Sequence, residues 1–218
     1  MAGRVRKRKQ QKLYVGVDPG KEGFICAVDH RCHIRVMWSI PYAGKQIDEV
    51  LLAKMIIALV KSGAQVFFLE HQQPHAKEGA VGAHSGGTAY GALRMACAMA
   101  GILGKVPYEI LRPEDWKRRA KIPVPSVPKA KLPPEPEKTK KADHRRWKKE
   151  VEKIKAKRSR EVKKRRKAHS IAMAERLQPH YDFYKTARSK GPHDGKCESF
   201  LLAREAWKQA RGIRDDAT

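Results

Sequence analysis

The chain has 218 residues, which is enough for one α/β domain with its own core and too few for two large domains. Its formal net charge is +25, because 48 Lys and Arg stand against 23 Asp and Glu. The sequence has no apolar window of the roughly 18 residues that a membrane span needs, no secretory signal at its basic N-terminus and no paired spacing among its four cysteines. We therefore expect a protein of a reducing compartment, cytoplasmic or in a nucleoid or organelle stroma, with no membrane partner.

The positive charge is concentrated in two segments. Residues 1–12 hold six basic side chains and no acid, and residues 117–169 hold 23 Lys and Arg against six Asp and Glu. The rest of the chain is close to neutral. Basic segments of this kind attract polyanions by neutralising phosphates and releasing counterions. The distribution predicts a nucleic-acid-binding protein with a basic N-terminal arm over 1–12 and a folded domain over 13–218, interrupted by a basic insert at about 117–169.

The first half of the chain is expected to form strands and one helix. Three apolar, β-branched runs predict strands, with a hairpin turn between the second and the third: Leu13–Asp18, Gly23–Asp29 and His33–Ile40. A helix follows over Ile47–Lys61, and Gln65–Glu70 is expected to be another buried strand.

The second half is expected to contain three further elements and the insert. The three elements are a small-residue helix over Gly86–Leu103, a short strand over Tyr108–Pro113 and a last helix from about Lys196 to Ala210. The insert begins after Trp116, and six prolines within residues 122–136 predict a stiff extended linker. From Arg145 the apolar residues recur at helical spacing, with basic residues on nearly every face. This order of elements predicts one α/β sheet with antiparallel and parallel parts.

Acidic residues stand where these elements end or begin. Asp18 and Glu70 each close a predicted strand, and Asp194 and Glu198 flank the start of the last helix, four residues apart and so on one face. Carboxylates are costly to bury alone, and the carboxyl ends of parallel strands meet at the edge where α/β sheets bind ligands. Hard divalent cations neutralise such a cluster, and a two-metal site hydrolyses phosphodiesters.

Each acid also has a purely structural explanation. Asp18 fits a turn that bonds its own backbone, Glu70 a surface ion pair, Asp194 a helix N-cap, and Glu198 a first-turn acid favoured by the helix dipole. Only the four acids together, on a chain whose other segments bind phosphate, indicate a catalytic site.

Four segments resemble one nuclease family in their order and spacing. The run VGVDPGKEGFICAVD resembles the opening of the RuvC-like Holliday-junction resolvases, FFLEHQQP their second acidic segment, and DGKCESFLLARE their closing helix with paired acids. YEILRPEDWK is similar to the strand–Pro–Trp–Lys passage of the phage and plastid branch of this family. The likeness spans most of Leu13–Arg204 and leaves out the basic insert.

The resemblance implies a ribonuclease H-like fold: a mixed five-stranded sheet flanked by helices, here with a basic, Pro-rich and helical insertion. It implies a homodimer, in a bacterial or phage-infected cell, that resolves four-way DNA junctions by paired nicks. The implied cofactor is Mg²⁺, two ions per site with Mn²⁺ as a substitute, and no small-molecule cofactor. The metal-ligand role falls on Asp18, Glu70, Asp194 and Glu198. Lys117 and a lysine near the start of the last long-helix segment, such as Lys167, would face the scissile phosphate.

Two features depart from the family. Its bacterial members space the last two acids three apart, whereas they are four apart here, as in the phage-like branch, and this makes His193 an additional or substitute ligand. The family also has a short loop where this chain carries the basic insert. We expect the DNA-binding residues to be Tyr90, for which a place in the core is an equal alternative, and the basic residues Arg118, Arg119, Arg145, Arg146, Lys163, Lys164, Arg165 and Arg166.

The function expected from the sequence is therefore a Mg²⁺-dependent, structure-selective endonuclease acting on branched DNA. One alternative is a nuclease with another preference, for single strands or flaps. The other is a non-catalytic nucleic-acid-binding protein on a ribonuclease H-like scaffold. The acid quartet discriminates between catalysis and binding, because a pure binder gains nothing from negative charge beside phosphate.

Overall fold

The computed structural model describes residues 11–20, 22–72, 79–123, 125–136, 141–186 and 188–213. Of the basic N-terminal arm expected over 1–12, residues 1–10 lie outside this description. Five strands form the main sheet: β1 (Leu13–Val17), β2 (Phe24–Val28), β3 (Ile34–Ser39), β6 (Ala64–Glu70) and β7 (Tyr108–Leu111). Two short strands, β4 (Tyr42–Ala43) and β5 (Gln46–Ile47), pair in a separate hairpin that the sequence analysis missed.

The main sheet is mixed, in the order β3-β2-β1-β6-β7. β1 pairs antiparallel with β2, and β2 with β3, whereas β6 runs parallel to β1 and β7 parallel to β6. Each parallel pair is joined by a connection long enough to contain a helix, as parallel pairing requires. The expected mixed five-stranded α/β sheet is confirmed.

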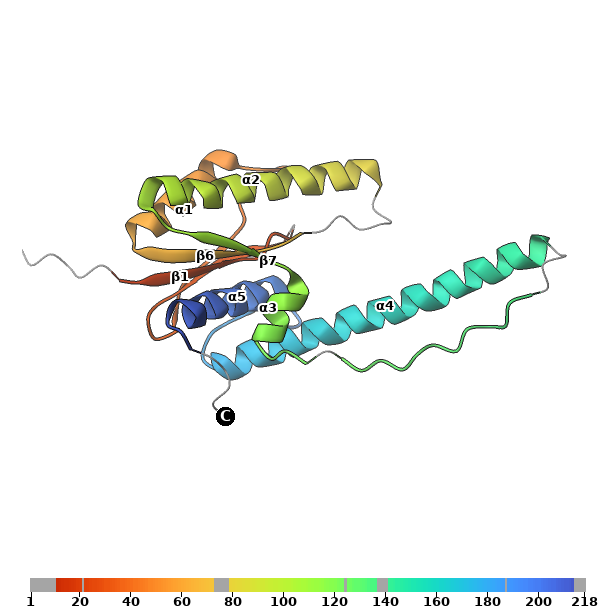
Figure 1. Cartoon of the computed structure of the whole chain (residues 1–218). Coiled ribbons are helices and arrows are strands. Elements are labelled where there is room, and N and C mark those ends of the chain that lie inside the picture. Colours follow the sequence, from red (N-terminus) through yellow and green to blue (C-terminus); the bar gives the residue numbers. More distant parts are fainter. Residues whose placement is uncertain are drawn as a thin grey trace, which may run out of the picture.

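Helices cover both faces of the sheet (Figure 1). The helices α1 (Glu49–Lys61) and α2 (Ala80–Gly104) lie on one face, and α5 (Asp194–Ala210), α3 (Pro113–Arg119) and the end of α4 (Lys141–Leu177) lie on the other. In β6 the consecutive Phe67 and Phe68 are both fully buried, each in the core on its own side of the sheet. Among the helices in the described residues, none is both long and apolar enough to cross a membrane.

The contact between β1 and α5 is unusually close. A Cβ built on Gly16 would lie 2.3 Å from the backbone nitrogen of Ala203 and 2.3 Å from the carbonyl oxygen of Ser199. No residue other than glycine fits there without moving the helix. Gly16 thus sets how near α5 approaches β1, the strand that directly precedes Asp18.

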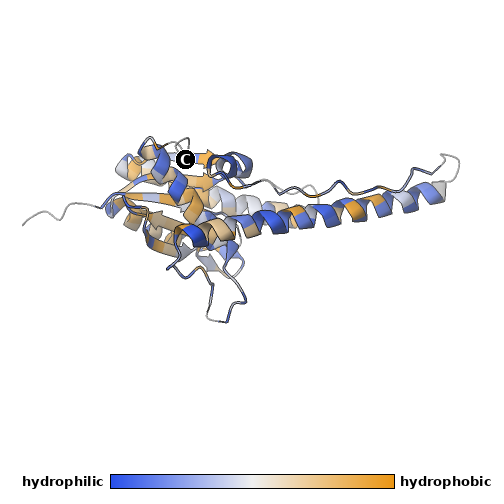
Figure 2. Cartoon of the chain, turned by 90° about the horizontal axis from the view of Figure 1, so that it is seen from below, coloured by the Kyte–Doolittle hydropathy of each residue, from blue (hydrophilic) through white to orange (hydrophobic). Residues whose placement is uncertain are grey.

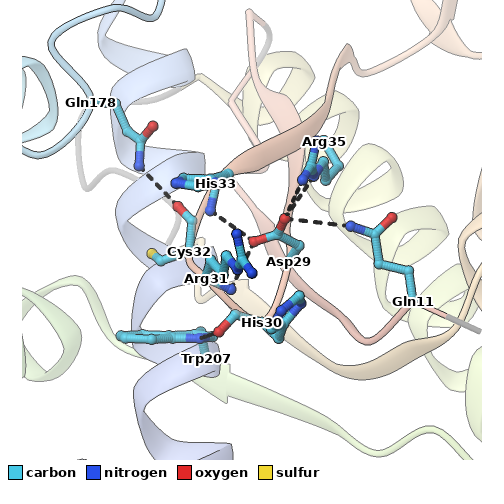
Figure 3. A network of polar contacts seen from close by, with 9 residues as sticks. All are labelled: Gln11, Asp29, His30, Arg31, Cys32, His33, Arg35, Gln178 and Trp207. Carbon is cyan, nitrogen blue, oxygen red and sulfur yellow. Dashed lines mark hydrogen bonds and ion pairs between the residues drawn. The ribbon is translucent and has the colours of Figure 1, made fainter.

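The turn between β2 and β3 is built around the buried carboxylate of Asp29 (Figure 3). It accepts hydrogen bonds from the backbone N–H groups of Arg31 (2.8 Å) and His33 (3.0 Å), and Arg35 donates to it at 2.7 Å. Burial opposes ionisation of Asp29, but these bonds outweigh it and lower its pKa. The hairpin turn expected between the second and third strands is confirmed, and Asp29 holds it.

Residues of the basic insert form a projection from the body (Figure 2). We call it the extension: residues 125–136, an extended segment, and the outer part of α4, 141–166. The two parts run side by side in opposite directions, because Trp147 donates to the carbonyl of Pro133 (2.9 Å) and Arg165 to that of Ser126 (3.0 Å). The extended linker and the long helix are therefore as expected, but the linker covers one face of α4, so the helix is not equally open on all sides.

Other differences from the expected elements concern their ends. The small-residue helix begins at Ala80 rather than Gly86. Pro113 starts the short helix α3, where the sequence analysis ended a strand and began the insert. The last helix begins at Asp194, two residues earlier than expected, and His193 is its N-cap.

Candidate active site

The first two acids lie at the same edge of the sheet. Asp18 directly follows β1 and Glu70 ends the parallel neighbour β6, with Val17 opposite Leu69 in the register. Asp18 Oδ1 accepts a hydrogen bond from the backbone N–H of Gly20 (3.3 Å), so Asp18 also stabilises the turn that follows β1. That bond engages only Oδ1.

The N-terminus of α5 brings the other two acids to this edge. A Cβ on Gly195 would lie 3.0 Å from Asp18 Oδ2, which shows how closely the first turn of the helix approaches that carboxylate. The N-cap is His193, whose Nδ1 accepts from the N–H of Gly195 (3.1 Å). Asp194 is therefore the first helical residue and not the cap.

Lysines from two other helices bind the α5 acids. Lys117 of α3 places its Nζ 2.6 Å from Glu198 Oε1, and Lys167 of α4 pairs with Asp194. Ser170, one turn after Lys167, donates to Glu198 Oε1 at 3.2 Å. Burial opposes ionisation of Asp194, but the bond from Lys167 outweighs it and lowers the pKa of the acid, and the same bond raises the pKa of Lys167.

Trp116 fixes the orientation of Glu70. Its indole is fully buried, and its Nε1 donates to Glu70 Oε2 at 2.8 Å. The next residue, Lys117, sits with its Nζ 4.9 Å from the indole ring centroid. Two neighbouring residues of α3 thus bind two different acids: the indole of Trp116 orients Glu70, and the ammonium group of Lys117 pairs with Glu198.

The charges of the four acids act on one another. Burial raises the pKa of Asp18 well above its usual value, and the carboxylates of Glu70, Glu198 and Asp194 raise it further. Burial also raises the pKa of Glu70 to about 7, although the attraction of Lys117 opposes this. The structure therefore brings together Asp18, Glu70, Asp194, Glu198, Lys117 and Lys167, six residues that the sequence analysis singled out.

The donor set fits a hard divalent cation in its chemistry. Carboxylate oxygens are the ligands that such cations prefer. Asp194 and Glu198 each pair with a lysine, and among the described residues no ion pair involves Asp18 or Glu70. In the described part of the chain, however, no three Asp, Glu, His or Cys side chains are grouped so that they could hold a metal ion. Lys117 holds Oε1 of Glu198 and Lys167 holds Oδ2 of Asp194, so a cation would compete with the lysines for these two oxygens.

The two ring nitrogens of His193 lie near groups other than the four acids. Its Nδ1 serves the helix cap, and its Nε2 lies 3.5 Å from Glu22 Oε2. In this arrangement neither ring nitrogen adds to the donor set.

The expected DNA-binding residues lie in several places. Tyr90 is a half-buried residue of α2 that packs on the core with its ring against His71. Arg118 pairs with Asp115, and Arg119 lies 3.6 Å from Glu109. These residues are not part of the cluster of acids.

The remaining expected DNA-binding residues lie on α4. Four of them are exposed: Arg145, Arg146, Lys163 and Lys164. Arg165 pairs with Glu161 at 2.8 Å as well as bonding the extended segment, and Arg166 is half-buried. The insert thus divides into residues that face solvent and residues that hold it together.

Two contributors to the site were missed by sequence reasoning. Trp116 was noted only as part of a motif, and Ser170 was not noted at all. A signal for Ser170 exists, since it follows Lys167 by three residues and so lies on nearly the same face of the helix. Nothing in the sequence marks Trp116 as a partner of Glu70, which is 46 residues away.

Comparisons with known proteins give the following. No family model matches the chain, and no curated protein matches it. Among solved structures it is similar to Thermus thermophilus RuvC in complex with a Holliday junction substrate, with a TM-score of 0.49 and 11% identity over 93% of this chain and 98% of that one. It is also similar to another Thermus thermophilus RuvC structure, with a TM-score of 0.47 and 12% identity over the same shares.

Proposed function

We propose that this protein is a divalent-metal-dependent, structure-selective endonuclease that resolves four-way DNA junctions. One observation carries the proposal: carboxylates from β1, β6 and α5 gather at the carboxyl edge of the sheet with two lysines, at the base of a basic extension. A concentration of acids beside a phosphate-attracting surface opposes plain DNA binding. It would suit phosphodiester hydrolysis, for which divalent cations held by the acids would supply the positive charge.

In this proposal each residue has a defined task. Asp18, Glu70, Asp194 and Glu198 would hold Mg²⁺, which would supply Lewis acidity and neutralise the charge that develops on the phosphate. Trp116 keeps one oxygen of Glu70 fixed by its hydrogen bond, and Ser170 does the same for Glu198. Fixed ligands reduce the reorganisation that the reaction needs.

Lys117 and Lys167 have two successive tasks. Without a cation they neutralise Glu198 and Asp194, as the ion pairs show. With Mg²⁺ bound by the acids, the two ammonium groups would be available to neutralise oxygens of the phosphate.

The test is cleavage of a synthetic four-way junction with Mg²⁺ and with EDTA. We expect cleavage with Mg²⁺ alone, and a loss of more than about a hundredfold in Asp18→Asn and in Glu70→Gln, because each removes a ligand charge. Junction binding by both variants should equal or exceed that of the wild type, since a negative charge beside the phosphates is gone.

The matched control is Asp115→Asn. This acid lies on α3 close to the site in sequence but pairs outward with Arg118, so cleavage should be unchanged. Near-wild-type cleavage by Asp18→Asn or Glu70→Gln would contradict the assignment of the ligands. A preference for single-stranded or flap DNA in the same assay would correct the substrate and keep the chemistry.

One observation favours a second candidate, a nucleic-acid-binding protein without catalysis. Two of the four acids are already paired with lysines, and among the described residues no group that could hold a metal ion is formed. This candidate expects tight junction binding and no cleavage in Mg²⁺ or Mn²⁺. The assay above separates the two functions directly.

A further inference from the structure

The two long sides of α4 differ in what they contact. Toward the extended segment the helix presents Val151, which is buried, together with Trp147 and Arg158, whose side chains donate to the carbonyls of Pro133 (2.9 Å) and Val127 (3.3 Å). This side is covered by protein. Among the described residues, no segment covers the opposite side of the helix in this way.

The uncovered side carries a continuous row of basic residues, which we call the basic ridge. Its members follow one another at steps of three or four residues: Arg146, Lys149, Lys153, Lys157, Arg160, Lys164 and Lys167. At about 100° of rotation per residue, such steps keep all seven on one face of the helix, opposite Trp147 and Val151. The row has no gap and contains no acid.

The ridge is exposed and lacks internal partners over most of its length. All seven side chains are exposed. Within the described part of the chain, the ion pairs of the ridge involve Lys167 alone. The acids of the helix lie beside the row rather than in it, and the Arg165 that pairs with Glu161 belongs to the covered side.

The ridge ends at the candidate active site. Its last member, Lys167, pairs with Asp194, and Ser170, one turn further along, donates to Glu198. At about 1.5 Å per residue the ridge is roughly 30 Å long, close to one turn of duplex DNA. The row of charges therefore runs straight from the tip of the extension to the acids.

We propose that the basic ridge binds the phosphates of one duplex arm of the branched DNA and directs that arm into the active site. This inference rests on the proposed function. A straight row of cations about one helical turn long matches a duplex, whose phosphates recur along a rigid axis. The extended segment acts as a brace that leaves one side of α4 for the DNA.

The composition of the ridge favours a duplex over other acidic partners. Binding of single strands relies on aromatic side chains on which bases stack, and the ridge has none. Protein interfaces are anchored by buried aromatic and apolar residues, and the ridge again has none. Contacts to duplex phosphates require neither stacking aromatic side chains nor buried apolar anchors.

The experiment compares two triple variants of equal charge. One changes the ridge, with Lys149→Gln, Lys153→Gln and Arg160→Gln. The other, the braced-side variant, changes exposed lysines of the extended segment and of the helix side that faces it, with Lys129→Gln, Lys131→Gln and Lys155→Gln. Binding to four-way junctions with arms of about 6 or about 20 base pairs is measured by fluorescence anisotropy at several salt concentrations, after circular dichroism has shown equal helix content.

With long arms, the affinity of the ridge variant should be at least about tenfold lower than that of the wild type. The slope of log affinity against log salt concentration should be less steep by about two to three. A short arm that starts at the active site is roughly 20 Å long and so falls short of Lys149 and Lys153. With short arms the loss should therefore be much smaller. The braced-side variant should stay within about threefold of the wild type on both substrates.

Equal losses in the two variants would mean that only the total charge matters, and would overturn the proposal. An unchanged ridge variant, or a loss independent of arm length, would overturn it as well. A wild type that binds the long arm through the ridge but does not cut the junction would refute the proposed function and leave the ridge as a duplex-binding surface.

Discussion

Glu70 is held between burial, which favours its protonated form, and the Trp116 and Lys117 groups, which favour its ionised form. Burial is the larger effect and raises the pKa of Glu70 from 4.5 to about 7. The folded protein therefore keeps this proton over a pH range in which the unfolded chain has lost it. Protonation of Glu70 therefore makes its full contribution to the free energy of unfolding below about pH 4.5, and this contribution is lost as the pH rises through about 7.

We expect Glu70→Gln to be more stable than the wild type at pH 8 without metal, and to show little difference at pH 4.5. The amide keeps an oxygen for the Trp116 bond but has no charge to bury. The gain at pH 8 is at most about 3 kcal/mol. Urea unfolding at both pH values, in the presence of a chelator, measures it.

Glu161→Gln is the control, since this exposed acid pairs with Arg165 and has a lowered pKa. It should show no gain at high pH. A gain for Glu70→Gln of the same size at both pH values would mean that the substitution acts through packing and not through the proton. Added Mg²⁺ should reduce the gain if the wild type binds the cation.

The roles of individual residues were only partly predictable from the sequence. Asp18 and Glu70 could be placed together because each ends an apolar run, and strand ends of parallel neighbours meet. The resemblance placed Lys117 at the scissile phosphate, but its pairing with Glu198 was not predicted, because the two residues are 81 positions apart and no pattern links them. The cap at His193 escaped notice, since histidine is not a usual capping residue.

At the scale of elements, the distance between β1 and α5 depends on a single missing side chain. Gly16→Ala would place a methyl group 2.3 Å from two backbone atoms, and backbone cannot turn aside as a flexible side chain can. We expect a loss of about 2–4 kcal/mol or more in the free energy of unfolding, measured by urea denaturation. The displaced helix carries Glu198, so cleavage should fall as well.

Gly87→Ala is the matched control for this change. A Cβ on Gly87 would meet nothing within 4 Å, and the residue lies inside α2. Alanine is the better helix former, so the control should gain up to about 1 kcal/mol. A Gly16→Ala protein as stable as the wild type would show that α5 can move away from β1 at no cost.

The sheet was largely predictable from its sequence, and the helices less so. Apolar runs bounded by turns identified the strands, and their order implied the mixed pairing. Helix α3 was not predicted, because Pro113 is compatible with the end of a strand as well as with the start of a helix. The brace along α4 could not be foreseen, because it rests on side chains that bond the carbonyls of residues 126, 127 and 133, contacts that have no periodicity.

At the scale of the whole molecule, we predict that a second copy of the chain packs against α2. Met95 and Ile102 are 65% and 83% exposed, and with the open Gly91 they form one stripe along the helix. Junction resolution by paired nicks requires two sites. We expect light scattering to give about twice 24.7 kDa for the wild type and about 24.7 kDa for a Met95→Glu, Ile102→Glu variant.

Leu132→Glu is the control for this prediction. Leu132 is also an exposed apolar residue, but it lies in the extension, so the variant should keep the mass of the wild type. A wild-type mass near 24.7 kDa at micromolar concentration would contradict a stable dimer. Equal masses for the wild type and the α2 variant would place any dimer interface elsewhere.

The extension also determines how the protein moves through a solvent. A rod of roughly 55 Å, the length of the 37-residue α4, gives the molecule a larger Stokes radius than a sphere of equal mass. A single copy will therefore elute early from a sizing column and sediment slowly, as a compact protein of greater mass would. Scattered intensity depends on mass and not on friction, so it separates an elongated single copy from a pair where elution volume cannot.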